Sequence, residues 1–358
     1  MLLTLISFII VLGVLILVHE FGHFITAKLF GVKVLEFSIG FPPRILSFKK
    51  NETKYTIGLL PLGGYVQMLG EDSVSKDPRA YNNATPGKRA LIGIAGVMMN
   101  LILAWVILSI CFIAGTTPIA MPSSQISGGV EVKPQIFVAE VVSGSAADKA
   151  GIKIGDQIIG TDTQTFENLQ AVTDFTKQNA GNKVTLKIKT ANIVSNKTLE
   201  LASGEDAALG VGILDQGIVK VVWYRAPLVA VQESYEIIKY TFSFLGSFIK
   251  QLFTTASISD QVGGPVAIYS LSGVAARSGV IVFLQFIAML SLNLALINIL
   301  PFPALDGSRV FFIILEKIFG KRIVKEEVEG IIHTLGFAVL ILFILAVTYK
   351  DIASLVHK

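Results

Sequence analysis

Four long runs of apolar residues constrain this chain more than any other feature. They cover residues 2–18, 90–115, 280–300 and 331–348, and none of them contains Lys, Arg, Asp or Glu. Each run approaches or exceeds the length of helix needed to cross the hydrocarbon core of a bilayer. Only 16% of all residues are charged, and the mean hydropathy is +0.66. The chain is therefore predicted to be a membrane α-helical protein with about four transmembrane helices.

The positions of the basic residues predict the orientation of these helices. Ten Lys and Arg lie within residues 28–89 and five within 309–325, whereas only two follow the last run. Because cytoplasmic loops are enriched in Lys and Arg, both clusters are expected in the cytoplasm and residues 116–278 outside it. The first run has no basic residue ahead of it and no small-residue cleavage site, which favours a membrane anchor over a cleaved signal peptide. The basic residues form no single stripe, so nucleic acid is not an expected partner.

Two segments do not fit the pattern of simple spans. Residues 55–68 are uncharged and rich in β-formers, but they are short and are interrupted by Pro61 and by Gly63 and Gly64. They are predicted to form a membrane-dipping β-hairpin that lines a cavity, because unpaired backbone is not tolerated against lipid. Residues 226–278 mix Phe and Ile with Glu and Lys, which predicts an interfacial amphipathic segment.

Between the second and third spans the pattern changes to that of a small soluble domain. Residues 116–225 form this extracytoplasmic region, with an α+β domain at about 136–215 that contains alternating strands and a helix over 169–178. The run VVSGSAADKAGIKIGDQIIGTD, at 141–162, resembles the bacterial type of PDZ domain. That resemblance implies binding of an extended peptide or carboxyl terminus by strand addition. A spacer that binds nothing is the alternative.

The pentad His19-Glu20-Phe21-Gly22-His23 ends the first apolar run. On a helix the two histidines lie four residues apart and face the same side, so both imidazoles reach one metal ion. Glu20 is then the candidate general base of a hydrolytic zinc site. The alternative is that these polar residues merely follow a membrane helix at the interface. Placing ionisable side chains beside lipid costs free energy unless they are paired or bound to a metal, and this favours the metal site.

A hydrolytic zinc site needs a third protein ligand. The best candidate is Asp306, which follows the third span after Pro301 and Pro303. The two prolines end that helix, as expected where chain lines a cavity rather than lipid. The predicted topology places the pentad and Asp306 on the same cytoplasmic side. An ordinary interfacial helix cap is the alternative role of Asp306. Residues 1–115 and 279–358 would then be the two parts of one membrane core.

These motifs together resemble the bacterial site-2 proteases, the intramembrane zinc proteases of the RseP and RasP type. The resemblance extends from the pentad through PLGGYVQMLGE at 61–71 and GIAGVMMN at 93–100 to GGPVAI at 263–268 and NILPFPALDG at 298–307. It implies that His19, His23 and Asp306 bind Zn²⁺, that Glu20 is the base, and that Asn298 helps to hold the substrate backbone. The best-known members carry two PDZ domains, whereas residues 116–225 have room for one.

The resemblance implies a zinc metalloendopeptidase of the bacterial inner membrane. Its substrates would be single-span membrane proteins, such as an anti-sigma factor or a remnant signal peptide. Our hypothesis is that the hairpin around Gly63, Gly64 and Tyr65 pairs with the unwound substrate, while Asn298 anchors the other side together with Pro301 and Pro303. The alternatives are a non-catalytic membrane receptor that binds protein termini through its PDZ-like domain, and a zinc hydrolase of lipids or small amides.

The sequence also suggests roles for three further residues. Gly96 and Asn100 lie four apart on the second span. They are expected to pack against the helix that carries the pentad, with substrate contact as the alternative. His333 is expected to be an interfacial residue without a catalytic role.

Overall fold

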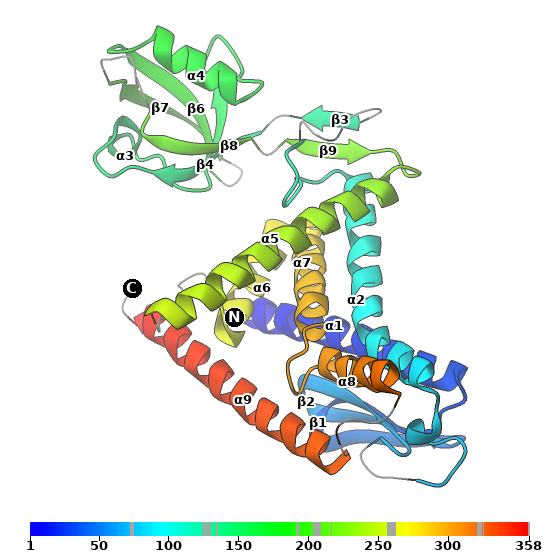
Figure 1. Cartoon of the computed structure of the whole chain (residues 1–358). Helices are drawn as coiled ribbons and strands as arrows, with labels where there is room; N and C mark the ends of the chain where they lie inside the picture. The colour runs from blue at the N-terminus through cyan, green and yellow to red at the C-terminus, as the bar shows by residue number, and fades with distance from the viewer. Residues whose placement is uncertain are drawn as a thin grey trace. The chain divides into compact units, whose positions relative to one another are not determined.

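The computed structural model describes residues 1–71, 75–123, 126, 130–133, 135–190, 193–202, 209–215, 217–255, 263–320, 324 and 326–356 (Figure 1). The chain divides into two compact units. The membrane unit combines residues 1–108 with 234–358, and the inserted unit comprises residues 109–233.

Four helices among the described residues are long and apolar enough to cross a membrane. They are α1 (Leu2–Leu29), α2 (Pro86–Ala114), α7 (Val280–Asn298) and α9 (Glu326–Val356), the last of which holds its candidate span at Val328–Ala353. Only 11% of the most apolar stretch of α9 is buried inside the protein, so the rest of that stretch needs an apolar solvent. The four predicted spans are confirmed as helices that are long and apolar enough to cross a membrane.

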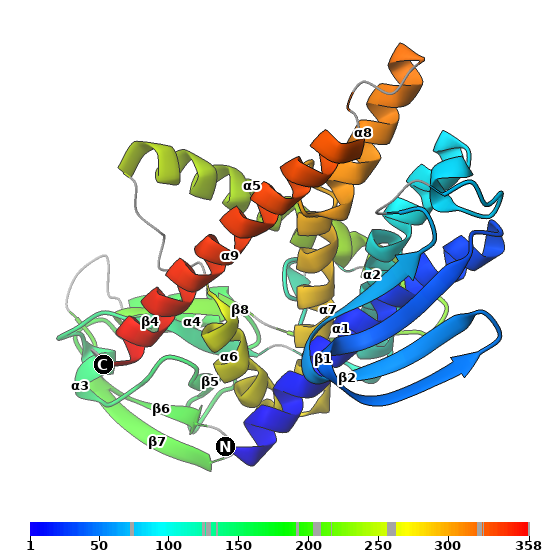
Figure 2. The ribbon, with the colours of Figure 1, turned by 90° about the horizontal axis from the view of Figure 1, so that it is seen from below.

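Helix α1 has one buried stripe that runs along its whole length. Its members recur at helical spacing and are Thr4, Ser7, Val11, Leu15, His19, Gly22, His23 and Ala27. The opposite face exposes large apolar side chains such as Leu5, Ile9 and Leu17. Helix α6 (Pro265–Ser278) and the sheet of β1 (Val34–Lys50) and β2 (Thr53–Met68) both pack along α1 (Figure 2). The two pentad histidines therefore point into the protein, whereas the opposite face of the helix has the composition of a lipid-facing surface.

The predicted hairpin within residues 55–68 is wrong, because the two arms do not pair with each other. Strand β2 (Thr53–Met68) pairs with β1 (Val34–Lys50), and both arms lie against the start of β1. Ser38 pairs with Thr56 on one side and with Tyr65 on the other. The sequence interpretation missed β1, whose first residues separate the arms. As a result the segment from Gly64 to Met68 forms an edge of the sheet.

Residues 226–278 form two helices rather than one segment. Helix α5 (Ala226–Thr255) is confirmed as amphipathic and is not among the candidate spans, whereas α6 packs against α1, α7 and α9. The carboxylate of Asp351 on α9 accepts hydrogen bonds from the backbone N–H groups of Gly264 and Ala267, at 2.9 and 3.1 Å. This side chain thereby satisfies donors at the start of α6 that have no partner inside the helix. The interfacial position of α5 stays a prediction.

The inserted unit is a small α+β domain. A five-stranded sheet has the order β7-β6-β5-β4-β8. Helix α4 (Leu169–Gln178) has the predicted bounds, and the side chain of Asn168 accepts a hydrogen bond from Ala171 N at 2.8 Å to cap it. The remaining elements are β3 (Val130–Lys133), β4 (Ile136–Val141), α3 (Ala146–Lys149), β5 (Gln157–Gly160), β6 (Lys183–Thr190), β7 (Ile193–Glu200), β8 (Val211–Asp215) and β9 (Ile218–Val221).

The core of this domain explains its strand pattern. Strand β6 alternates buried and part-buried residues, and Leu186 and Ile188 are fully buried. Ile136 and Ile158 from the neighbouring strands β4 and β5 meet them in one apolar cluster. The insertion of a β domain into a membrane protein is thus borne out, while its likeness to a PDZ domain stays a prediction.

Candidate metal centre and its cavity

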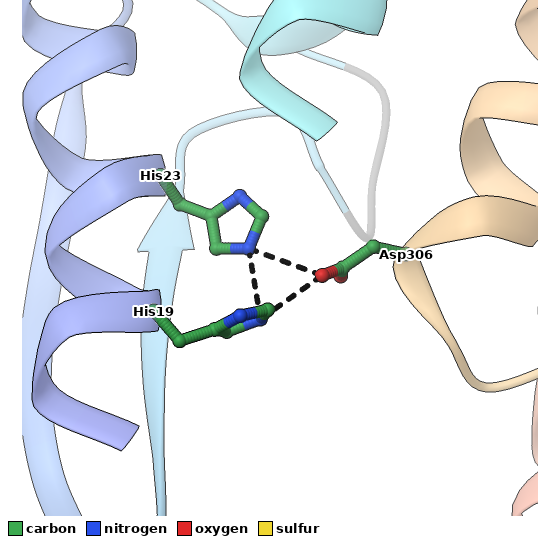
Figure 3. A group of neighbouring side chains, drawn as sticks. All are labelled: His19, His23 and Asp306. Carbon is green, nitrogen blue, oxygen red and sulfur yellow. Dashed lines mark hydrogen bonds and ion pairs between the residues drawn. The ribbon is translucent and has the colours of Figure 1, made fainter. Parts of the chain in front are cut away.

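His19, His23 and Asp306 converge on one point in the membrane unit (Figure 3). The histidines come from adjacent turns of α1, and Asp306 is the first residue of α8 (Asp306–Phe319). The Nε2 atoms of His19 and His23 lie 3.0 and 3.3 Å from Asp306 Oδ2 and 3.3 Å from each other. Both imidazoles are about nine-tenths buried. Residues almost 290 positions apart in the sequence thus form one cluster.

The spacing of these three atoms fits a zinc ion. Protein nitrogen and oxygen ligands lie about 2.0 to 2.1 Å from Zn²⁺, so two ligands at tetrahedral corners lie roughly 3.4 Å apart. The observed separations of 3.0 to 3.3 Å are close to that value. Two imidazoles and one carboxylate also leave the fourth position open, which is the arrangement of a catalytic rather than a structural zinc site.

Charge favours the same assignment. Burial raises the pKa of the Asp306 carboxyl, but interactions with His19 and His23, when these rings are protonated, outweigh it and hold the pKa below its ordinary value. The carboxylate is therefore ionised and available as a ligand at neutral pH.

Backbone and side-chain groups of α2 orient both imidazoles. His23 Nδ1 donates to the carbonyl oxygen of Ile92 at 2.8 Å, which leaves Nε2 without a proton for metal binding. The side-chain amide of Asn100, fully buried, lies 3.3 Å from Nδ1 of His19, and its Oδ1 has no partner among the described residues. An amide flip lets Oδ1 accept a hydrogen bond from Nδ1–H of His19, which satisfies that oxygen and leaves Nε2 of His19 without a proton as well.

Gly96 allows α2 to lie directly against the two imidazoles. A Cβ atom built at this position would collide with His23 Nε2 and with the ring of His19, where it would lie 2.8 Å from Nε2. No flexible side-chain end is available to move away, because both rings are buried and hydrogen-bonded. The expected packing role of Gly96 against the pentad helix thus agrees with its contacts.

Gly96→Ala is expected to weaken zinc binding by about 10- to 100-fold, the range found when residues that orient metal ligands are changed. The added methyl group must displace an imidazole ring from its position. Competition with a chelator of known zinc affinity measures the change in Kd. Gly87→Ala is the matched control, since Gly87 lies on the same helix with no atom within 4 Å of an added Cβ. Equal zinc affinity in both variants would contradict the close-packing argument.

A cavity of about 430 Å³ opens beside the three ligands, a size typical of a binding site. It is lined on one side by the residues around Glu20 on α1, and on the other by the edge segment of β2 and the start of α8. Gly64 brings the two sides together, because a Cβ there would lie 2.9 Å from Ile16 Cγ2 and 3.0 Å from Glu20 Cγ. Glu20 therefore lines the same open cavity as the metal ligands and a strand edge.

Some predicted substrate-binding residues line this cavity and others do not. Gly64 and Tyr65 do, and the Tyr65 hydroxyl donates to Glu36 Oε1 at 2.8 Å. Pro301 lines a neighbouring cavity of about 290 Å³ together with Asp306. Gly63, Asn298 and Pro303 are absent from the residues that line either space in the described part of the chain. Their contact with substrate stays a prediction.

Other cavity residues were missed by the sequence interpretation. Arg309 pairs with Glu71 across the cavity, which joins α8 to the end of the β2 region. Tyr81, in the short 3₁₀ helix Tyr81–Asn83, lies in the same wall, and burial raises its pKa to about 12. His333 of α9 also lines the cavity, and its expected place at the interface stays a prediction. These are single polar residues outside any motif, so the sequence contains no pattern that predicts their place in the cavity.

Comparison with known proteins gives a consistent result. Residues 7–343 match the model of peptidase family M50. A chain of Clostridium acetobutylicum, whose name assigns it provisionally to the zinc metalloproteases, is 37% identical over 341 residues, covering 95% of this chain and 94% of that one. Zinc metalloprotease RasP of Geobacillus kaustophilus is 28% identical and regulator of sigma-E protease RseP of Salmonella typhimurium 30% identical.

The two alignments differ in length from this chain. They extend over 442 and 449 positions and cover 98% of this chain, with 97% of RasP and 98% of RseP, although the chain itself has 358 residues. Those relatives therefore contain inserted segments that are missing here.

Proposed function

The chain belongs to peptidase family M50 and is a membrane zinc metalloprotease of the site-2 type, and from this premise we propose that it cleaves single-span membrane proteins within or near the bilayer. The observation that carries the proposal is the convergence of His19, His23 and Asp306 at the end of a membrane-spanning helix. Because α1 is built to face lipid along its other face, a site on its buried stripe lies beside the membrane.

The residues of the site divide the chemistry between them. His19, His23 and Asp306 would hold the ion, and zinc, when bound there, polarises the scissile carbonyl group and acidifies a water molecule. Glu20 takes the proton from the attacking water and delivers it to the amine that leaves. The cavity walls hold the peptide beside these groups and limit the entry of bulk water. Each step uses a group that already lines the cavity.

The edge of β2 is suited to hold an extended substrate. The segment from Gly64 to Met68 pairs with β1 on one side only, and Gly64, Tyr65, Val66 and Met68 line the cavity. A peptide bond in a membrane helix is shielded by its own hydrogen bonds, so a substrate must unwind before it is cut. An unwound substrate recovers backbone hydrogen bonds by adding to this edge as a further strand. Asn298 would hold the same strand from its other side.

The inserted domain offers a second edge for peptides. Strand β8 pairs with β4 alone and ends the five-stranded sheet. We place this domain outside the cytoplasm and the metal centre towards the cytoplasmic side of the inner membrane, as the distribution of basic residues predicts. A trimmed extracytoplasmic stump or carboxyl terminus that pairs with β8 would present its span to the metal centre. This is the binding mode expected of a PDZ-like domain.

A tagged single-span protein, reconstituted with the enzyme in vesicles, tests the proposal. We expect one cleavage within or near the span, located by mass spectrometry of both products. Replacing two helix-breaking residues near the cut with leucine should slow cleavage about 30-fold, because each change stabilises the helix by roughly 1 kcal/mol. Cleavage of a uniform poly-leucine span at the same rate would contradict the unwinding step.

A further inference from the structure

Helix α9 braces the loop that presents Asp306. Gly336 lies against Pro303, and a Cβ at position 336 would collide with the backbone of that proline. The backbone N–H of Ala304 donates to Nδ1 of His333 at 3.1 Å. Ala304 has a φ of 81°, a conformation that a residue with a Cβ adopts only when its surroundings enforce it. His333 is thus one of the groups that fix the backbone two residues before the metal ligand.

The same hydrogen bond fixes the proton of the His333 ring. Because Nδ1 accepts a hydrogen bond, it carries no proton, and the neutral imidazole must carry its proton on Nε2. That atom is buried and has no hydrogen-bond partner among the described residues. The ring of Phe312 lies edge to face against the imidazole, with centroids 6.3 Å apart, and restricts its rotation. A buried donor without a partner is costly, which calls for a partner that arrives later.

Most other side-chain donors of the cavity are already engaged. Among the described residues that line it, Tyr65 donates to Glu36, Arg309 pairs with Glu71, and Thr334 donates to the carbonyl of Gly330. The Tyr81 hydroxyl lies 3.5 Å from the carbonyl oxygen of Arg89 as a weak donor. The two pentad histidines face Asp306. His333 lines this cavity and also a neighbouring one of about 310 Å³, and its buried Nε2–H thus remains an uncommitted donor in the described part of the chain.

We propose that His333 is a catalytic residue whose Nε2–H donates a hydrogen bond to the substrate's scissile carbonyl oxygen. Negative charge develops on that oxygen when water adds to the carbonyl carbon, and it is lost again when the C–N bond breaks. A donor held in place before the reaction stabilises this charge without reorganisation. The proposal rests on the proposed function, since it assumes a peptide carbonyl in this cavity. It assigns a role to α9 that no motif of the sequence indicates.

Two substitutions separate this role from bracing of the loop. In His333→Asn the amide oxygen replaces the Nδ1 acceptor for Ala304, but the distal donor is lost. In His333→Gln the longer side chain returns an N–H donor near the position of Nε2, but it provides no acceptor at Nδ1. If the donor acts on the substrate, His333→Asn lowers kcat by about 10² to 10³-fold with KM nearly unchanged. His333→Gln then stays within about tenfold of the wild type, and both variants retain zinc.

The assay uses the full-length protein in detergent with a short unstructured peptide that the wild type cleaves and Glu20→Gln does not. Higher activity in the Asn variant than in the Gln variant would assign His333 to loop bracing only and overturn the proposal. Equal losses in both, wild-type rates in both, or loss of zinc would also overturn it. A failure of the proposed function is distinguishable, because it appears as cleavage of the peptide without cleavage of any single-span substrate.

Discussion

Asp306→Ala is expected to remove bound zinc and proteolytic activity together. The substitution leaves only two imidazoles at the site, and two ligands do not hold zinc at the free concentrations found in a cell. Activity should fall to the uncatalysed background, a loss of at least about 10⁶-fold for a peptidase. Zinc per chain after gel filtration, measured by atomic absorption, and cleavage of the unstructured peptide are read on the same sample.

Controls separate metal loss from misfolding. Asp306→Asn keeps the shape and one oxygen of the side chain but removes the charge, so we expect weaker zinc binding rather than its complete absence. Asp162→Ala removes a carboxylate that is 62% exposed on the inserted domain, and it should keep one zinc per chain. An Asp306→Ala protein that elutes as the wild type does and still carries one zinc would exclude this carboxylate as a ligand.

Local patterns in the sequence were sufficient to predict much of the membrane unit. A charge-free run of about 20 residues has few alternatives to a spanning helix, so α1, α2, α7 and α9 follow directly from composition. The four-residue spacing of His19 and His23 predicts a shared face because helical geometry is fixed. The role of Asp306 could also be predicted, because the expected topology brings the ends of the first and third spans to the same side of the membrane.

The features that were missed depend on contacts between distant segments. Strand β1 was not recognised, and so the two arms of residues 55–68 were paired with each other instead of with the Ser38 region. Two neighbouring strand segments can pair with each other, or a third strand can lie between them. The local sequence pattern is the same in both cases. The place of His333 depends likewise on how α9 crosses the Asp306 loop, where Gly336 meets Pro303.

These missed contacts explain how the site is held in shape. Asp306 supplies a ligand, but the position of its side chain depends on the preceding loop. Ala304 in that loop has a positive φ, and His333 of α9 accepts a hydrogen bond from its backbone N–H. The histidines likewise depend on the carbonyl of Ile92 and on the absence of a side chain at Gly96. Two helices, α2 and α9, and one loop therefore orient the three ligands, and a change in any of them is expected to alter metal affinity without replacing a ligand.

Glu20→Gln is the second large effect, and it differs from the first in what it preserves. Glutamine has nearly the same shape as glutamate but cannot accept a proton from water at neutral pH. We expect kcat to fall by about 10³ to 10⁴-fold while zinc content and KM stay near the wild-type values. Steady-state cleavage of the unstructured peptide and zinc analysis on one preparation measure all three quantities.

The comparison of the two variants tests the division of roles at the site. Gly64 leaves little room around the Glu20 side chain, so the isosteric amide should fit without displacing the β2 edge, whereas Glu20→Ala would open a space that water enters. If Glu20→Gln retained more than a tenth of the wild-type kcat, another group would have to accept the proton. If it lost zinc as Asp306→Ala does, Glu20 would belong to the metal-binding set. Loss of turnover with full zinc content is the outcome that identifies Glu20 as the base.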